Sequence, residues 1–377
     1  LVEVKSSTSV KDLYLHDVAV QYHVLQKAGL NINRAFLMHV NNQYTNDGNQ
    51  LDLKGYFSVA DLTDQILSIQ DAIPQELADL NNMLVKPDPP EIQTSRHCRN
   101  PYQCEFWEHC TRGMPEHWVM RLFRVNQGTL NELAAINVRD IRDIPEFFPL
   151  SEVQERIRSC VINNSEHFSP ELEEELKDVK YPVHFLDFET LAPTIPRYPG
   201  TRPFQTIPFQ WSDHVLNEDG TLDHLEYLSE ENKDPREDFS RTLLKALGNK
   251  GTIFIYTAYE KRIINELADH FLEFRNELLE IPDRFKDLHA IIREYFYHPE
   301  FHGSFSLKSV LPTLFPEMDY ANLSIQEGTQ ATMEYLKMID PLTPLEEKEK
   351  IKEGLLIYCG QDTLAMVKVR DELLGRF

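Results

Sequence analysis

The sequence predicts an α/β fold whose C-terminal half is a mixed β-sheet with helices on both faces. Short apolar runs, typical of buried strands, are followed there by longer segments with helical periodicity. The first strand candidates follow one another closely, as antiparallel strands do, and the last is followed by helices. The strand candidates are residues 183–188, 209–216, 224–228 and 252–256, and the helix candidates are residues 238–247, 259–279, 287–296, 306–314 and 346–374.

The composition limits the class of protein. The chain has 377 residues, enough for two or three domains, and 41% of them are hydrophobic. Its formal net charge of −23 argues against a protein that coats nucleic acid nonspecifically, although a basic groove can be local. No run approaches the ~18–20 apolar residues of a membrane span. We expect a cytoplasmic protein with no membrane segment and no signal peptide; the oligomeric state is not predicted.

The N-terminal part is predicted to begin as a strand, a helix and a second strand. Gly29 ends the first helix, and Pro74 interrupts the second. Because Leu1 lies inside the first expected strand, we expect a fragment whose first domain is incomplete. The segments in order are a strand at 1–5, a helix at 13–30, a strand at 35–40 and a helix at 61–84.

The middle of the chain combines cysteines, short helices and an acidic stretch. Short helices are expected within residues 128–165, and the acidic residues 170–176 read as a solvated helix face near a domain boundary. We therefore expect three parts: residues 1–115 with the cysteines near their end, a helical linker region at residues 116–179, and the sheet domain at residues 180–377.

Two short motifs carry most of the functional information. Asp187 and Glu189 follow an apolar run, and because side chains alternate along a strand they point the same way. Tyr358 and Asp362 lie four residues apart in a helical segment and also share a face. Carboxylate oxygens are ligands that Mg²⁺ and Mn²⁺ prefer, and pairs of such ions drive phosphodiester hydrolysis. The motifs therefore indicate a site for two divalent cations.

A third acidic residue lies between these motifs. Glu260 opens a helix directly after the strand candidate 252–256. The ordered set resembles the DnaQ-like exonucleases of the ribonuclease H-like fold, in the subclass with a tyrosine four residues before the last aspartate (DEDDy type). The resemblance implies that Asp187, Glu189 and Asp362 bind the metals directly and that Tyr358 orients the attacking water. Glu260 replaces the usual aspartate and is implied to act through a water.

Neighbouring residues are expected to be structural or to contact phosphate. Cys359 should pack against the sheet, and His184 should be a strand residue with a satisfied ring. Asp287 opens a helix and could equally lie near the site. Residues 303–312 combine small residues, hydroxyls, a helix start and one lysine, which are groups that contact phosphate, although a simple serine cap explains them equally well.

Three cysteines form a cluster of the kind that binds metal. Cys98, Cys104 and Cys110 are separated by five residues each, and aromatic residues lie among them. Zinc and iron–sulfur sites normally need four ligands, so we expect a further cysteine upstream of the given sequence.

A second resemblance agrees with this expectation. Residues 1–7 resemble the Glu-x-Lys strand of PD-(D/E)xK nucleases, and residues 17–21 resemble the helix motif of their RecB and Cas4-like branch. In that branch one upstream and three clustered cysteines hold a 4Fe–4S cluster. The resemblance implies that Glu3 binds metal, that Lys5 stabilises developing charge, and that Gln21 belongs to the same site. The preceding family aspartate is absent here.

The whole order resembles a family of bacterial proteins known by the domain of unknown function 2779 (DUF2779). We expect a metal-dependent nuclease, with 3′–5′ exonuclease activity on DNA or RNA in residues 180–377. Two alternatives stay open. One is a noncatalytic nucleic-acid-binding protein with a zinc- or iron–sulfur-stabilised domain, and the other is a phosphodiesterase for short oligonucleotides.

Overall fold

The computed structural model describes residues 1–318 and 323–376. Contacts divide the chain into two compact units, which we describe separately. Unit 1 comprises Leu1–Gln93 and Ala192–Thr206, and unit 2 comprises Thr94–Leu191 and Ile207–Phe377. This division groups the cysteine segment and the short helices with the C-terminal sheet. The three-part organisation expected from the sequence stays a prediction about folding units.

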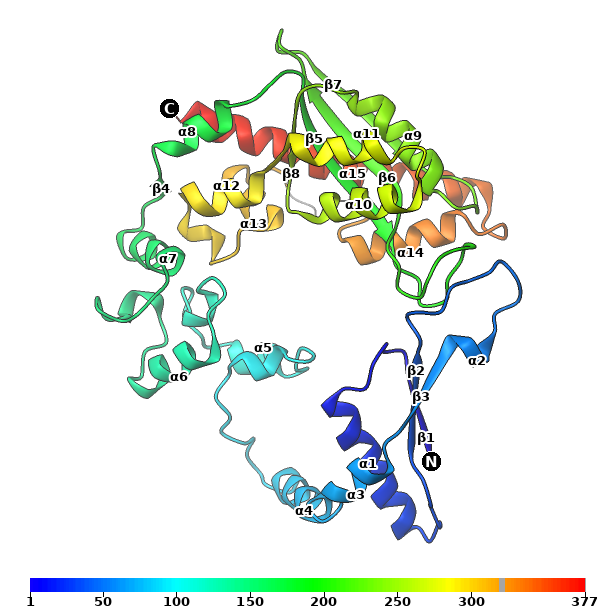
Figure 1. The fold of residues 1–377 in the computed structure, drawn as a ribbon. Helices are drawn as coiled ribbons and strands as arrows, with labels where there is room; N and C mark the ends of the chain where they lie inside the picture. The colour runs from blue at the N-terminus through cyan, green and yellow to red at the C-terminus, as the bar shows by residue number, and fades with distance from the viewer. Residues whose placement is uncertain (319–322, 377) are drawn as a thin grey trace. The chain divides into compact units, whose positions relative to one another are not determined.

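Unit 1 contains a three-stranded sheet of order β1-β2-β3 (Figure 1). The first two strands are parallel and are joined by α1, whereas β3 is antiparallel to β2. The predicted strand–helix–strand start is therefore confirmed, and β3 is an additional strand. The elements are β1 (Val2–Lys5), α1 (Asp12–Lys27), β2 (Phe36–Val40), α2 (Leu53–Tyr56), β3 (Phe57–Asp61), α3 (Thr63–Ile69) and α4 (Ile73–Leu84).

The core of unit 1 forms where α1 packs on the sheet. Val18 and Tyr22, one turn apart on α1, are buried with Leu37 of β2 and Ile66 of α3. The interruption expected near Pro74 in the helical segment 61–84 is confirmed, since α3 and α4 are separate helices. The break falls before Pro74, which occupies the first turn of α4, where its missing N–H costs no hydrogen bond.

Unit 2 is built on a five-stranded mixed sheet of order β7-β6-β5-β8-β9. The strands β5, β6 and β7 are antiparallel neighbours, whereas β8 and β9 run parallel to β5. The four expected strands and the mixed α/β class are confirmed. The sequence did not predict β9, which is too short to show a period. The strands are β5 (Val183–Leu191), β6 (Ile207–Leu216), β7 (Leu222–Leu228), β8 (Thr252–Ile255) and β9 (Phe285–Asp287).

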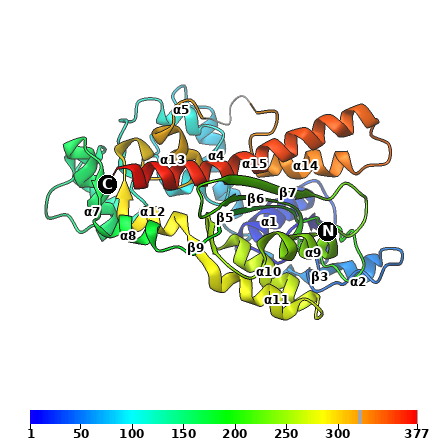
Figure 2. The ribbon, with the colours of Figure 1, turned by 90° about the horizontal axis from the view of Figure 1, so that it is seen from above.

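One face of this sheet packs against three helices, α9 (Arg236–Leu247), α10 (Tyr259–His270) and α11 (Arg275–Glu280) (Figure 2). Leu186, Phe188 and Trp211 project from the strands into this core. The single helix expected over residues 259–279 is wrong. Phe271 takes an extended conformation after α10 and packs its ring against the core, and this separates α10 from α11.

The opposite face is covered by α15 (Leu345–Gly375) and α14 (Gly328–Met338), with α13 (Leu307–Leu314) beside α15 (Figure 2). Tyr335 of α14 stacks on Phe209 of β6 with ring centroids 3.8 Å apart. The sequence analysis missed α14, although Ala331, Tyr335 and Met338 have helical spacing and are buried.

The other elements of unit 2 are short. The acidic stretch forms α8, in which Leu172 and Leu176 are buried, and the Arg370 guanidinium of α15 donates to the Leu176 carbonyl at 3.0 Å. The short elements of unit 2 are η1 (Arg96–Arg99), α5 (Trp107–Thr111), η2 (Val119–Arg121), α6 (Gln127–Ala135), η3 (Ile141–Asp143), α7 (Glu152–Asn163), β4 (His167–Phe168), α8 (Glu171–Lys177), η4 (Ile281–Arg284), α12 (Leu288–Tyr295), β10 (Phe296–Tyr297) and η5 (Pro299–Phe301).

Within residues 1–318 and 323–376, no helix has the length and apolar character needed to cross a membrane.

Gly251 allows the start of β8 to approach the chain before β5, and its replacement should destabilise unit 2. Its φ is +92°, and an added Cβ would lie 2.0 Å from the Pro182 carbonyl oxygen. We expect Gly251→Ala to lower the free energy of unfolding by about 3 kcal/mol or more, because backbone strain and overpacking add. Gly220→Ala is the control, since φ is +84° but nothing lies within 4 Å. Urea unfolding should show a clearly smaller loss for the control, and equal losses would contradict the prediction.

Candidate metal centre

The carboxylates of the first motif lie on the face of the unit 2 sheet that α15 covers. Asp187 pairs with Ser212 and Glu189 pairs with Gln210 on the neighbouring strand β6. The pairing shifts directly after Glu189, and the strand ends at Leu191. The alternation predicted from the sequence is thus confirmed, and it places both acids on one face of β5, with Asp187 in the middle of the strand and Glu189 two residues nearer its C-terminal end.

Hydrogen bonds between α15 and β6 bring the second motif to the first. Thr363 Oγ1 is hydrogen-bonded to Ser212 Oγ and to His214 Nδ1, each at 2.8 Å. The Gln210 side-chain amide donates to the Leu355 carbonyl of α15 at 2.8 Å. These buried contacts fix the rotation of the helix.

As a result, Asp187, Glu189 and Asp362 each offer a carboxylate oxygen within 4.8 Å of the other two. Glu189 is buried, whereas Asp187 and Asp362 are partly exposed. Three acids from a strand and a helix far apart in sequence therefore form one compact cluster that solvent can reach.

Two further carboxylates lie beside this cluster. Glu260, in the first turn of α10, is buried, and its charge raises the pKa of Asp187. Asp287 accepts a hydrogen bond from the Ala290 amide at 2.9 Å as the cap of α12, and its charge also acts on Glu260. The prediction that Asp287 opens a helix as its cap is therefore confirmed. Glu260 is not within the 4.8 Å set, so it lies outside the innermost group of acids.

Crowding and burial raise the pKa values of these acids. Burial, followed by the charges of Asp362, Glu260 and Glu189, raises the pKa of Asp187 well above its usual range. Burial and the Asp362 charge raise the pKa of Glu189 to about 8. Burial and the Asp287 charge raise the pKa of Glu260 to about 7. Like charges held this close favour protonation or a bound cation.

The donor set fits one or two hard divalent cations. Carboxylate oxygens are the ligands that Mg²⁺ and Mn²⁺ prefer. Glu260 Oε2 is buried and has no hydrogen-bond partner among the described residues, so it is an acceptor that a coordinated water could satisfy. Asp187, Glu189 and Asp362 would hold the ions, with Glu260 contributing from the next layer.

The surroundings of the cluster are apolar on one side and cationic on the other. Cys359 is fully buried, with its Sγ 3.8 Å from Asp187 Oδ2, so it packs against the sheet as expected. Tyr358 is 4% exposed, and the Lys308 Nζ lies 5.8 Å from the centroid of its ring. Lys308, in the first turn of α13, also lowers the pKa of Glu189 against the effect of burial.

The helix α14, which was not predicted from the sequence, also contributes to the site. A Cβ added at Gly328, the first residue of this helix, would lie 3.8 Å from Glu189 Oε2. Thr332 Oγ1 donates to the Thr190 carbonyl at 3.0 Å, and Thr190 Oγ1 is hydrogen-bonded to the Tyr259 hydroxyl at 2.6 Å. The signal that could have found this helix is the helical spacing of its buried residues.

In unit 1 the structure brings together the residues expected to form a second site. Lys5 Nζ lies 2.8 Å from Glu3 Oε1 and pairs with Asp17. The Gln21 amide donates to Glu3 Oε2 at 3.0 Å and to Asp17 Oδ1 at 3.2 Å. The hydrogen bonds that Lys5 donates to the Asp17 and Glu3 carboxylates raise its pKa. Asp17 is a member of this cluster to which the sequence analysis assigned no role.

The three clustered cysteines lie in a loop and two short helices. Cys98 is in η1, Cys104 follows it, and Cys110 is in α5; the Cys104 amide donates to the Cys98 carbonyl at 2.7 Å. All are free thiols. Their sulfurs do not form a set of three within 4.8 Å among the described residues. The iron–sulfur or zinc centre stays a prediction.

A second group of candidate ligands lies elsewhere in unit 2. Glu116, Glu300 and His302 have ligand atoms within 4.8 Å of one another. Both glutamates are exposed, and exposed acidic groups commonly meet without an ion. We therefore assign no metal to this group.

Comparison with known proteins supports one of the expected resemblances. Residues 184–306 match the model of a family described as a domain of unknown function, DUF2779. The DUF2779 segment contains Asp187, Glu189 and Glu260, whereas Tyr358 and Asp362 follow it in the chain. No curated protein and no solved structure matches the chain.

The raised pKa values predict that the stability of the metal-free protein depends on pH. Glu189 binds its proton more tightly when folded, because its pKa is about 8 against an ordinary 4.5. The free energy that this tighter proton binding contributes to folding is fully present below the ordinary pKa and is lost as the pH rises through the folded value. The loss is at most about 1.4 kcal/mol per pH unit for one proton. Unfolding in urea with a chelator present should therefore show Glu189→Gln gaining stability relative to the wild type as the pH rises. A difference in unfolding free energy between Glu189→Gln and the wild type that does not change with pH would contradict the prediction.

Proposed function

We propose that unit 2 is a metal-dependent nuclease that hydrolyses phosphodiester bonds of DNA or RNA, as a 3′–5′ exonuclease. The observation that carries the proposal is the cluster of Asp187, Glu189 and Asp362, whose oxygens lie within 4.8 Å of one another. Like charges at this distance are stabilised by divalent cations, and the phosphodiester group is itself an anion that such cations bind.

The topology of unit 2 supports this proposal. An antiparallel β5-β6-β7 ribbon extended by parallel β8 and β9 is the strand order expected of a ribonuclease H-like sheet. The acids lie on β5, at the start of α10 after β8, and on the long C-terminal helix. Position by position, this is the arrangement that the resemblance to DnaQ-like exonucleases implies.

The residues of the chain have distinct roles in the proposed reaction. Two bound cations would supply Lewis-acid stabilisation of the attacking and leaving oxygens. The Tyr358 hydroxyl, one helical turn before Asp362, orients the attacking water. Burial keeps its pKa above the ordinary value, so it remains a hydrogen-bond donor at neutral pH. Cys359 and the sheet behind Asp187 exclude water from the side of the cluster away from the substrate.

Lys308 supplies the positive charge near a site that is otherwise acidic. Its ammonium donates to the Gln326 carbonyl at 2.7 Å, which holds it beside the Tyr358 ring and within electrostatic reach of Glu189. A cation fixed there stabilises charge that develops on the phosphate in the transition state. The lysine that the sequence indicated in residues 303–312 is therefore proposed to act at the same site as the carboxylates.

Unit 1 is proposed to contribute a second, PD-(D/E)xK-like site. The contacts of Glu3, Lys5 and Gln21 with one another and with Asp17 support it. Cys98, Cys104 and Cys110 are proposed to be ligands of a 4Fe–4S cluster.

Loss of a metal ligand should abolish cleavage without unfolding the protein. We expect Asp362→Asn to lower the turnover of end-labelled single-stranded DNA or RNA, with Mg²⁺ or Mn²⁺, by about 10²-fold or more, because it removes a charged ligand at the reacting centre. Glu353→Gln is the control, since it removes one exposed carboxylate from the same helix.

Equal activity in the wild type, Asp362→Asn and Glu353→Gln would contradict the proposal. Metal-independent binding of the same substrates by all three proteins, with no cleavage by any, would instead support a noncatalytic nucleic-acid-binding module. Turnover of short oligonucleotides alone would indicate a small phosphodiesterase.

Lys308 should affect turnover more than substrate affinity. We expect Lys308→Ala to lower kcat by about 10- to 100-fold with a smaller change in KM, because the charge acts on the transition state. Lys308→Arg should restore part of the rate. A change confined to KM would show that Lys308 only binds the substrate, and an unchanged kcat and KM would remove it from the site.

A further inference from the structure

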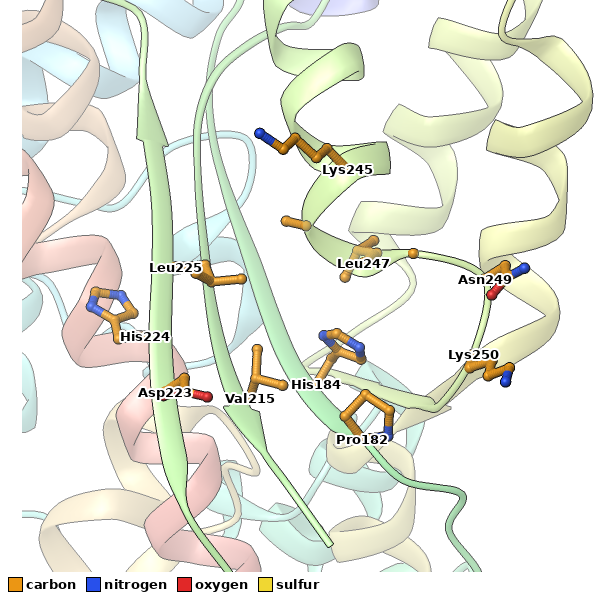
Figure 3. A pocket seen from close by; sticks show the side chains of 12 residues that line it. Pro182, His184, Val215, Asp223, His224, Leu225, Lys245, Leu247, Asn249 and Lys250 are labelled. Carbon is orange, nitrogen blue, oxygen red and sulfur yellow. The ribbon is translucent and has the colours of Figure 1, made fainter.

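The pocket at the start of β5 presents few polar groups to a ligand (Figure 3). His184 Nδ1 lies 2.7 Å from Asp213 Oδ2, and the two side chains are 2% and 0% exposed. The His184 ring was expected to be satisfied, but its Nε2 has no hydrogen-bond partner among the described residues and is buried from solvent. Asn249 and Lys250 point away from the pocket (Figure 3). We therefore assign no ligand to it.

A different part of unit 2 exposes aromatic rings next to arginines. We call Arg99, Tyr102, Phe106, Trp107 and Arg121 the aromatic–arginine surface. Tyr102 and Phe106 are 67% and 69% exposed, although aromatic side chains of this size are usually well buried. They lie in the loop between Arg99 and Trp107, and the side chains of these two residues contact each other. The loop is therefore closed at its ends, and it presents its aromatic rings to solvent.

The contact between Arg99 and Trp107 forms a flat platform. The Arg99 guanidinium carbon lies over the Trp107 ring, 4.1 Å from its centroid. The Trp107 ring in turn lies 5.8 Å from the Trp118 ring, with 37° between the two planes. A guanidinium held in this way by a ring keeps its other side available. Because Arg99 is exposed, a further planar group can stack on it.

The chain beneath this platform is tightly packed. The Val119 amide in η2 donates to the Arg139 carbonyl at 3.0 Å. At the end of η2, the Arg121 carbonyl oxygen would lie only 1.5 Å from a Cβ added at Gly303. The backbone that carries Trp118 and Arg121 is therefore fixed against the rest of unit 2 before any ligand binds.

The charge of this part of the chain is opposite to that of the whole protein. Residues 94–124 contain five arginines and three glutamates, whereas the formal net charge of the chain is −23. Arg99 and Arg121 are exposed and line one pocket of about 210 Å³, which Glu116 also lines. Among the residues that the structure describes, neither guanidinium has a hydrogen-bond or ion-pair partner. Both are therefore available to an anion, and the planar fork of arginine suits a phosphate group.

We propose that the aromatic–arginine surface binds single-stranded nucleic acid. The bases of a single strand stack on aromatic rings and on guanidinium planes, and arginines bind its phosphates. The pocket of about 210 Å³ is smaller than the roughly 300–1,000 Å³ of small-molecule sites, so it suits one group of a longer ligand that lies across the surface. The choice of a nucleic acid rests on the proposed nuclease function, but binding at this surface needs no divalent cation.

Fluorescence anisotropy tests this proposal on the full chain. The probes are a labelled single-stranded oligothymidylate and a duplex of the same length, without divalent cations so that no cleavage follows. We expect saturable binding of the single strand, at least tenfold tighter than that of the duplex, whose bases are not free to stack. Tyr102→Ala/Phe106→Ala should weaken single-strand binding by tenfold or more. Arg99→Lys should weaken it almost as much as Arg99→Ala, because lysine keeps the charge but has no planar group.

Tryptophan fluorescence reports on the platform directly. Trp107 and Trp118 are two of the three tryptophans, and the third, Trp211, is buried in the core of unit 2. The single strand should quench the emission of the wild type. Trp107→Phe should retain most of the affinity, because a ring remains, and should lose most of the quenching. Quenching that is unchanged in Trp107→Phe would contradict stacking at this position.

The matched control removes two apolar side chains that are even more exposed. Phe147 and Leu342, elsewhere in unit 2, are 93% and 90% exposed, and Phe147→Ala/Leu342→Ala should leave the affinity unchanged. Absence of saturable single-strand binding, equally tight binding of the duplex, or equal weakening by the two double variants would overturn the proposal. Wild-type binding with these losses in the surface variants, but no cleavage when Mg²⁺ or Mn²⁺ is added, would support this surface and contradict only the nuclease activity.

Discussion

The contact on which the candidate site depends is the hydrogen-bonded packing of α15 against β6. Thr363 is bonded to Ser212 and His214, and Leu355 accepts a bond from Gln210, so two points on one helix are tied to one strand. Asp362 is adjacent to the first of these points, and its direction is therefore fixed by polar contacts buried beneath it. The acids of β5 and α15 lie far apart in the sequence. This packing is what brings them close together in the fold.

Bringing the acids together creates an electrostatic constraint that the rest of the site reflects. Burial and like charge raise the pKa values of Asp187, Glu189 and Glu260, so the cluster favours protons or cations at neutral pH. Lys308 opposes this effect at Glu189. Without a bound cation, the repulsion among these acids would lower the stability of the protein. The cluster as a whole therefore indicates a cation site more strongly than any one of its acids does.

The two faces of the unit 2 sheet carry different chemistry because strand residues alternate. On β5, Asp187 and Glu189 are directed toward α15 and belong to the acidic cluster, whereas His184, near the start of the strand, faces the other side. On that second side, the Arg284 guanidinium donates to the carbonyls of Leu247, Gly248 and Gly251, around the turn between α9 and β8. One strand thus carries an acidic cluster on one face and a buried histidine on the other.

The sequence by itself determined the local features of this protein. It predicted the four longer strands of unit 2, the shared direction of Asp187 and Glu189, and the helical spacing of Tyr358 and Asp362, because these depend on the periods of strands and helices. It also indicated the strand and helix that carry Glu3 and Gln21. It could not separate α10 from α11, since the break depends on how Phe271 packs against the core.

Only the tertiary structure decided which of these features meet. The short strand β9 and the helix α14 are held by neighbours, and their own sequences show little beyond a few buried positions. The joining of Asp362 to β5, the approach of Lys308 and Gly328 to Glu189, and the unsatisfied nitrogen of His184 all arise between segments distant in the chain. Distances between such segments depend on packing and buried hydrogen bonds, which residue spacing does not record.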